Sequence, residues 1–193
     1  VMVFGANIGG FHGQGMAALA YANDTENWRK HSPNLPEDVK SNKVGDFAIA
    51  GQTGFMQGNK GKGYGLVTVT RPGGRSLNNE ELRSEISDFY KYAEANPHLE
   101  FIVPYNSDKN LNRKSLDELV KLFKEGFTIP SNVRFGNRML DALKITQPTA
   151  PTEAGKEGVS EVFNENSELA SIGTQEQYSA YLNTVFPDSQ VKD

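Results

Sequence analysis

The first 22 residues, VMVFGANIGGFHGQGMAALAYA, join an apolar run, a glycine-rich turn and an alanine-rich segment. The apolar run 1–4 ends at Gly5, and residues 16–22 are strong helix formers. Four apolar residues are too few to separate a strand from a helix by periodicity, but the glycines that follow favour a buried strand. The order of strand, glycine turn and helix predicts the opening unit of an α/β sheet.

The rest of the chain continues this alternation up to about residue 145. Runs rich in β-branched or aromatic residues predict strands, and apolar residues at helical spacing predict helices. We expect strands at 46–50, 66–70, 101–104 and 132–135, and helices at 80–95 and 116–124. Residues 25–45 carry Pro33 and Pro36 and predict an irregular surface excursion. The fold class expected is α/β, with a mixed β-sheet covered by helices.

Three regions are expected along the chain. Residues 1–145 form the α/β domain, and residues 146–160, with Pro148 and Pro151, have the composition of a linker. Residues 161–193 hold enough apolar residues for a helical tail or the start of a further domain, which needs a surface to dock on. Both ends of the chain read as cut, which suggests a segment of a larger protein.

Composition excludes several classes of function. The chain has 193 residues, a formal net charge of −4 and no cysteine. The negative charge argues against general nucleic-acid binding, which relies on clustered positive charge. The three histidines rule out a histidine-rich metal cluster, so we expect no metal and no cofactor. No stretch approaches the ~20 apolar residues of a membrane span, and the absence of cysteine fits a reducing compartment.

The first glycine-rich loop is the sharpest functional signal. Glycines let backbone N–H groups turn toward a phosphate, and Asn7 can bond a ribose hydroxyl or a base edge. The alternative is that the glycines only form a tight strand-to-helix turn. No acidic residue follows at the dinucleotide-binding spacing and no Walker lysine follows the glycines, so neither motif is indicated. The ligand-binding residues expected here are Gly5, Asn7, Gly9, Gly10, His12, Gly13 and Gly15.

A second glycine-rich stretch, 51–65, follows the predicted strand 46–50. Lys60 and Lys62 lie among its glycines, so it can close over an anionic ligand, or it can be a mobile hairpin connection. Its position after a strand favours a functional role, because ligands bind beyond the carboxyl ends of strands. From this stretch we expect Gln52, Thr53 and Gly54 to contact the ligand.

The quoted opening resembles macro-domain-like proteins of bacteria and phages, in which VFGSN-x-x-G-x-HG-x-GAA is the corresponding pattern. The resemblance covers most of residues 1–143 and implies a three-layer fold that binds ADP-ribose or a related nucleotide. It matches Asn7 to an asparagine that contacts the distal ribose, and the glycines at 9, 10, 13 and 15 to a diphosphate loop. It also implies a cytoplasmic protein of a bacterium or phage-infected cell.

Some family members remove ADP-ribose from proteins or nucleic acid, so hydrolysis is the alternative to binding. The catalytic candidates are Asn7, His12, Asp46 and Asp108. After the strand 101–104 the family has a glycine-rich loop, whereas this chain has Tyr105-Asn106-Ser107-Asp108-Lys109-Asn110-Leu111, which leaves both activities open. A third alternative is an interaction module whose glycine loops are architectural and whose tail binds a protein partner.

Overall fold

The computed structural model describes residues 1–22, 36–71, 74–104, 114–136, 139 and 142–143. The predicted linker and tail, 146–193, and the candidate Asp108 lie outside these residues. The elements in chain order are β1 (Met2–Asn7), α1 (Gly15–Tyr21), α2 (Pro36–Lys40), β2 (Gly54–Gln57), β3 (Lys62–Val69), α3 (Asn79–Ala95), β4 (Phe101–Val103), α4 (Leu116–Lys124) and β5 (Val133–Phe135).

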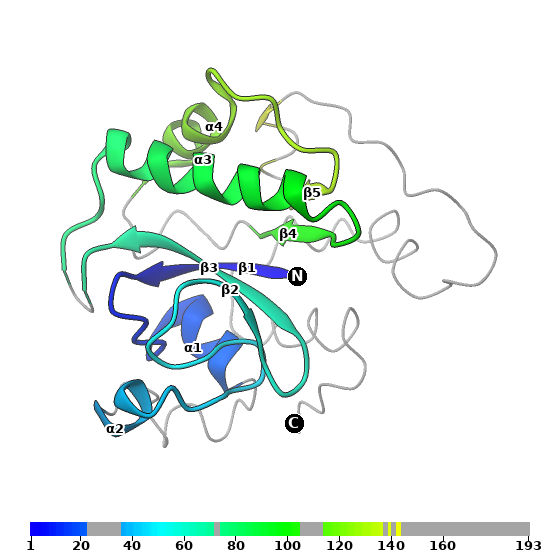
Figure 1. Ribbon diagram of the computed structural model, residues 1–193. Helices are drawn as coiled ribbons and strands as arrows, with labels where there is room; N and C mark the ends of the chain where they lie inside the picture. The colour runs from blue at the N-terminus through cyan, green and yellow to red at the C-terminus, as the bar shows by residue number, and fades with distance from the viewer. Residues whose placement is uncertain (23–35, 72–73, 105–113, 137–138, 140–141, 144–193) are drawn as a thin grey trace.

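The strands form one mixed sheet of five strands in the order β2-β3-β1-β4-β5 (Figure 1). Strand β1 is parallel to both of its neighbours, β3 and β4, and β4 is parallel to β5. Only β2 is antiparallel, paired with β3 as the two arms of a hairpin. The expected α/β fold with a mixed sheet is therefore confirmed.

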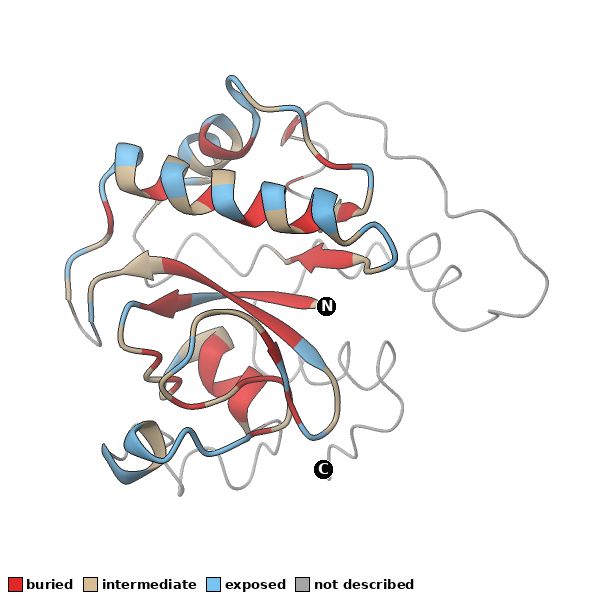
Figure 2. Ribbon diagram, viewed as in Figure 1, coloured by how far each residue is buried: buried red, intermediate tan, exposed pale blue. Residues whose placement is uncertain are grey.

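Helices cover both faces of this sheet, with α1 on one side and α3 and α4 on the other (Figure 1). Side chains alternate along a strand, so Met2, Phe4 and Ala6 of β1 pack with α1. Val3 points the other way and packs with the buried stripe of α3. The central strand β1 is thus buried between two apolar clusters along most of its length (Figure 2).

The helices α3 and α4 begin at local capping signals. At each start the side chain of the cap residue, Asn78 or Ser115, accepts a hydrogen bond from the backbone of the third helical residue. The glutamate at that third position, Glu81 or Glu118, bonds back to the cap backbone, which completes a capping box. Two such boxes explain why the expected helices 80–95 and 116–124 agree closely with the structure.

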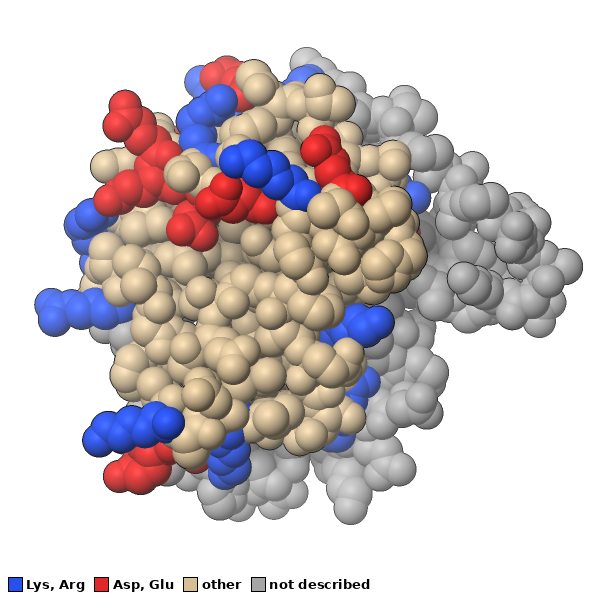
Figure 3. Space-filling model, in the orientation of Figure 1, with Lys and Arg blue, Asp and Glu red and all other residues tan. Residues whose placement is uncertain are grey.

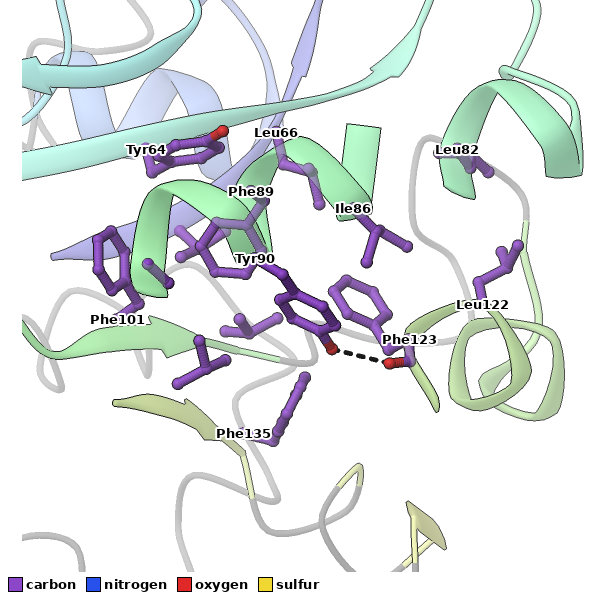
Figure 4. Close-up of a cluster of buried hydrophobic side chains, with 14 of the residues drawn as sticks. Tyr64, Leu66, Leu82, Ile86, Phe89, Tyr90, Phe101, Leu122, Phe123 and Phe135 are labelled. Carbon is purple, nitrogen blue, oxygen red and sulfur yellow. Dashed lines mark hydrogen bonds between the residues drawn. The ribbon is translucent and has the colours of Figure 1, made fainter. Parts of the chain in front are cut away.

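Aromatic side chains fill the space between α3, α4 and the sheet (Figure 4). Phe89 of α3 lies against Tyr64 of β3 and Phe101 of β4, with ring centroids 4.9 and 5.6 Å away. Tyr90 Oη donates a 2.8 Å hydrogen bond to the carbonyl of Phe123, which ties α3 to α4. Burial raises the pKa of Tyr90, so the hydroxyl stays protonated and remains a donor. This layer is held as a rigid unit on one face.

Four expectations for secondary structure were wrong. Residues 46–50 form no strand, because Phe47, Ala48 and Ala50 bury themselves in a bent segment against α1 and the sheet. Strand β2 lies inside the glycine-rich stretch that was expected to be loop, and β3 begins at Lys62 rather than at 66. Helix α2 lies within the expected irregular excursion.

Candidate functional site

The carboxyl edge of the sheet is the first candidate for a site because of the chain topology. Strand β1 is followed by α1 on one face, whereas its neighbours β3 and β4 are followed by α3 and α4 on the other. Where adjacent parallel strands send their connections to opposite faces, a crevice opens beyond their carboxyl ends, and ligands bind there. The end of β1 lies at such a switch point.

Strand pairing along β1 is uneven at this end. On one side β1 pairs with β3 from Met2–Gly63 through to Asn7–Val69. On the other side, within the described residues, it pairs with β4 only at Met2–Ile102. Pro104 follows β4 directly and has no N–H to continue the ladder. The carboxyl half of β1 is therefore joined to β3 and not to the described part of β4.

Asn7, at the end of β1, organises the first glycine-rich loop. Its side-chain Nδ2 donates to the carbonyl of Phe11 at 2.7 Å, and its Oδ1 accepts from the N–H of Phe11 at 3.1 Å. The carbonyl of Asn7 also accepts from the N–H of Gly10 at 3.0 Å. The Asn7 side chain is buried, so its hydrogen bonds go to the loop itself.

The two glycine-rich stretches meet at Gly10. Its carbonyl accepts a 2.9 Å hydrogen bond from the N–H of Gly51. A Cβ on Gly10 would lie 2.5 Å from the backbone nitrogen of Gln52, and its φ of +66° is in the region that favours glycine. The structure thereby places Gly51 and Gln52 beside the first loop, whereas Gly54 begins β2 and pairs with Gly65 of β3.

His12, whose side chain is buried, also connects the two glycine-rich stretches. Its Nε2 lies 3.0 Å from the carbonyl oxygen of Ile49 and 3.1 Å from that of Gln52. Carbonyl oxygens only accept, so Nε2 carries the proton and donates to both. The ring is 0% exposed and packs edge-on against Phe4, with centroids 5.4 Å apart.

Burial also fixes the protonation state of His12. It lowers the pKa of His12, and this effect outweighs the hydrogen bonds to Ile49 and Gln52, which favour the charged form. Nδ1 is buried without a hydrogen-bond partner among the described residues. A second proton on Nδ1 would thus have no acceptor. The role that this geometry supports is a neutral clasp that holds residues 49–52 against the first loop.

The rest of the second glycine-rich stretch lies at the opposite, amino edge of the sheet. Gly58 and Gly61 belong to the β2–β3 turn, and β3 starts beside Met2, the first residue of β1. Asp46 lies with this turn, because its carboxylate pairs with Lys60 at 3.1 Å and its carbonyl accepts from the Lys60 N–H at 2.9 Å. The structure therefore separates Asp46, Lys60 and Lys62 from Asn7 and His12.

The remaining predicted ligand contacts differ in exposure. Gly5 is exposed within β1, Gly9 and Gly13 are half-buried, and Gly15 starts α1 with a φ of +56°.

Thr68 of β3 was not predicted, although it lies beside Gly5 on the same face of the sheet. Only the register of two parallel strands more than 60 residues apart brings them together, and no local pattern records that register.

Two charged side chains near this edge, Arg75 and Glu81, pair with each other. Acidic side chains gather over α3 (Figure 3). There Glu81 forms a 2.8 Å ion pair with Arg75. The hydrogen bonds from Arg75 and from the backbone of Asn78 lower the pKa of Glu81 to about 2. This pair stabilises the start of α3 rather than leaving a free carboxylate.

The described residues hold neither a candidate metal centre nor a candidate membrane span. They contain no group of three or more histidine, aspartate or glutamate side chains placed to hold a metal ion. None of the helices that the structure describes has the length and apolar character needed to cross a bilayer.

Comparisons with known proteins do not add a relative. The chain matches no protein-family model, no curated protein and no solved structure. The case for function therefore rests on the residues and their geometry.

Proposed function

We propose that this chain binds ADP-ribose or a related phosphate-bearing nucleotide at the carboxyl edge of β1. The observation that carries the proposal is the joining of the two glycine-rich stretches at a topological switch point, where the Gly51 N–H bonds to the Gly10 carbonyl. The resemblance of residues 1–17 to macro-domain-like proteins supports the same ligand class and a macro-like three-layer domain.

The loop geometry supports binding because the segments at this edge are held in place before a ligand arrives. Asn7 ties the first loop through two side-chain hydrogen bonds, and His12 ties residues 49–52 through two more. A preorganised site loses less conformational entropy when it binds. The half-buried Gly9 and the exposed Gln52 then offer a surface that a diphosphate can approach closely.

Binding is supported better than hydrolysis by the placement of the catalytic candidates. A general base must come within hydrogen-bond reach of the proton that it removes. Asn7 and Nε2 of His12 bond within the loops, Nδ1 of His12 is buried, and Asp46 pairs with Lys60 at the other edge of the sheet. These three groups do not converge, so we propose a binding protein.

Isothermal titration calorimetry tests this function. ADP-ribose, ADP and NAD are titrated separately into the full chain, and circular dichroism of the same sample verifies that the protein is folded. Saturable binding of ADP-ribose is the expected result. A folded sample that gives no saturable signal with any of the three ligands overturns the proposal.

A further inference from the structure

Gly5 interrupts the burial of the central strand. In β1 the other five residues are buried, whereas Gly5 is exposed, and this is the pale blue stretch of β1 in Figure 2. Interior strand positions normally carry side chains that pack, because glycine weakens a strand. The absence of a side chain here needs a physical reason.

Packing within the chain supplies that reason for the glycines of β3. A Cβ on Gly63 would lie 2.1 Å from the carbonyl oxygen of Phe47, and one on Gly65 would lie 3.3 Å from the Cβ of Ala6. Both positions face the α1 side, where the bent segment that contains Phe47 presses on the sheet. Glycine is required at Gly63 because the Phe47 backbone occupies the space, and at Gly65 a Cβ would be tight against Ala6.

Gly5 is not blocked by backbone atoms as Gly63 is, and it has no unusual backbone conformation. Among the residues that the structure describes, a Cβ on Gly5 would meet only the side chain of Thr68, at 3.1 Å from Oγ1 and 3.7 Å from Cγ2. Its φ is not among the positive values found at other glycines. A β-bulge follows one residue later, between Ala6 and Asn7, and does not by itself exclude a side chain at Gly5. Another reason for a glycine inside a strand is the close approach of a ligand to the backbone.

Gly5 and Thr68 also lie where a ligand is expected. They are on the α3 and α4 face, beyond the buried Val3 and in the half of β1 that the described part of β4 does not pair. Thr68 is half-buried and places a hydroxyl beside the bare backbone. A hydroxyl both donates and accepts a hydrogen bond, and the Gly5 Cα and the Thr68 methyl add a small apolar surface.

We propose that Gly5 and Thr68 form the floor of a ribose subsite, with the sugar ring lying against Gly5 and Thr68 Oγ1 bonded to a ring hydroxyl. A ribose suits this floor better than the other parts of a nucleotide. Gly5 and Thr68 supply no positive charge to bind a phosphate, and one hydroxyl makes too few hydrogen bonds to recognise a base edge. The resemblance gives the ribose to Asn7, whose amide here holds Phe11 instead. This inference rests on the proposed nucleotide binding and refines it.

Two variants test the subsite by calorimetry with ADP-ribose. Gly5→Ala adds one methyl group that the fold accommodates by a small shift of Thr68, but the methyl lies where the sugar would sit. We expect binding at least ~10-fold weaker, because the lost contact and the steric clash act together. Thr68→Val keeps the shape and the strand propensity and removes the hydroxyl, so we expect affinity to fall roughly 10-fold.

Controls separate this subsite from the wider function. Thr128→Val removes a hydroxyl from an exposed threonine near the amino edge, before β5, and should bind like the parent chain. Ribose 5-phosphate and ADP, titrated into the parent and Thr68→Val, show which part of the ligand uses Oγ1. Only the ligands whose ribose occupies the floor should lose affinity in Thr68→Val.

The outcomes are distinct. If the parent binds ADP-ribose and both Gly5→Ala and Thr68→Val bind it equally well, the subsite is wrong and nucleotide binding stands. If the parent binds none of the probes, both proposals fall. Should Gly5→Ala fail to fold, Thr68→Val decides alone, and unchanged affinity in that variant overturns the subsite.

Discussion

The two glycine-rich stretches are similar in composition but have different roles in the structure. Glycines around 5–15 shape the carboxyl edge of β1 and leave backbone exposed at Gly5. Gly58 and Gly63 instead allow the backbone of Asp46 and Phe47 to pack closely against them. A glycine count therefore does not distinguish a ligand loop from a packing contact. The atoms around each glycine make that distinction.

The largest expected effect is on a packing glycine. Gly63→Ala would place its Cβ 2.1 Å from the carbonyl oxygen of Phe47, near the start of β3. Backbone atoms cannot move aside as a side chain can, so we expect the free energy of unfolding to fall by about 3 kcal/mol. Urea denaturation measures this change. A stability equal to that of the parent would remove the distinction between the two kinds of glycine.

The clasp that joins the two stretches should give an intermediate effect. His12→Leu keeps an apolar side chain in the buried space but leaves the carbonyls of Ile49 and Gln52 without their donor. We expect a loss of about 2 kcal/mol in the free energy of unfolding at pH 7.5. Thermal or urea unfolding measures it, and a loss below about 0.5 kcal/mol would show that the clasp is not needed.

The same histidine predicts a dependence of stability on pH. Because burial lowers the pKa of His12 in the folded state, the unfolded chain takes up the proton first as the pH falls. Stability is full above the ordinary histidine pKa of ~6.5 and declines below it, by at most ~1.4 kcal/mol per pH unit. Unfolding curves from pH 7.5 to 5 should converge for parent and His12→Leu. Parallel curves would contradict the buried neutral state.

A smaller effect on stability is expected at Gly5. In Gly5→Ala the new methyl group meets only the movable side chain of Thr68, and alanine also reduces the entropy of the unfolded chain. The change in the free energy of unfolding should stay below about 1 kcal/mol, in contrast to Gly63→Ala. The two variants, unfolded side by side in urea, compare an exposed glycine with a packed one. Equal losses would mean that Gly5 is a packing residue as well.

The smallest effect concerns the lysines of the second stretch. Lys60→Gln removes the ion pair with Asp46 at the amino edge and should cost about 0.5 kcal/mol of stability. Affinity for ADP-ribose should not change, because this turn lies at the far edge of the sheet from Gly10. Calorimetry on this variant checks it. Weaker binding of ADP-ribose by Lys60→Gln would show that the second glycine-rich stretch contacts the phosphates of the ligand.

Sequence alone predicts the parts of this fold that depend on neighbouring residues. The helices at 79–95 and 116–124 follow from caps at Asn78 and Ser115 and from apolar spacing within one segment. Residues 46–50 misled because an alternating apolar pattern also suits a bent segment that buries Phe47. Strand β2 was missed because glycine and glutamine lower strand propensity, and pairing with β3 overrides them.

The site follows the same division. The glycine-rich turn after β1 could be predicted from the sequence because strand, turn and helix follow one another along the chain. A functional role for the second stretch was predicted from a strand before residue 51 that does not exist. The hydrogen bonds of Gly51 and His12 join this stretch to the first loop instead. The pair of Gly5 and Thr68 depends on β-sheet register, which a single sequence does not display.

Amide NMR with ADP-ribose tests most directly whether the ligand binds at the first glycine-rich stretch rather than at the second. Backbone shifts of the labelled full chain are followed as the ligand is added. We predict the largest changes at Gly5, Gly9, Gly10 and 52–54, with Thr68 among them and the turn 58–61 unaffected. Changes centred on 58–61, with the carboxyl edge of β1 unchanged, would contradict the assignment of ligand binding to the first stretch.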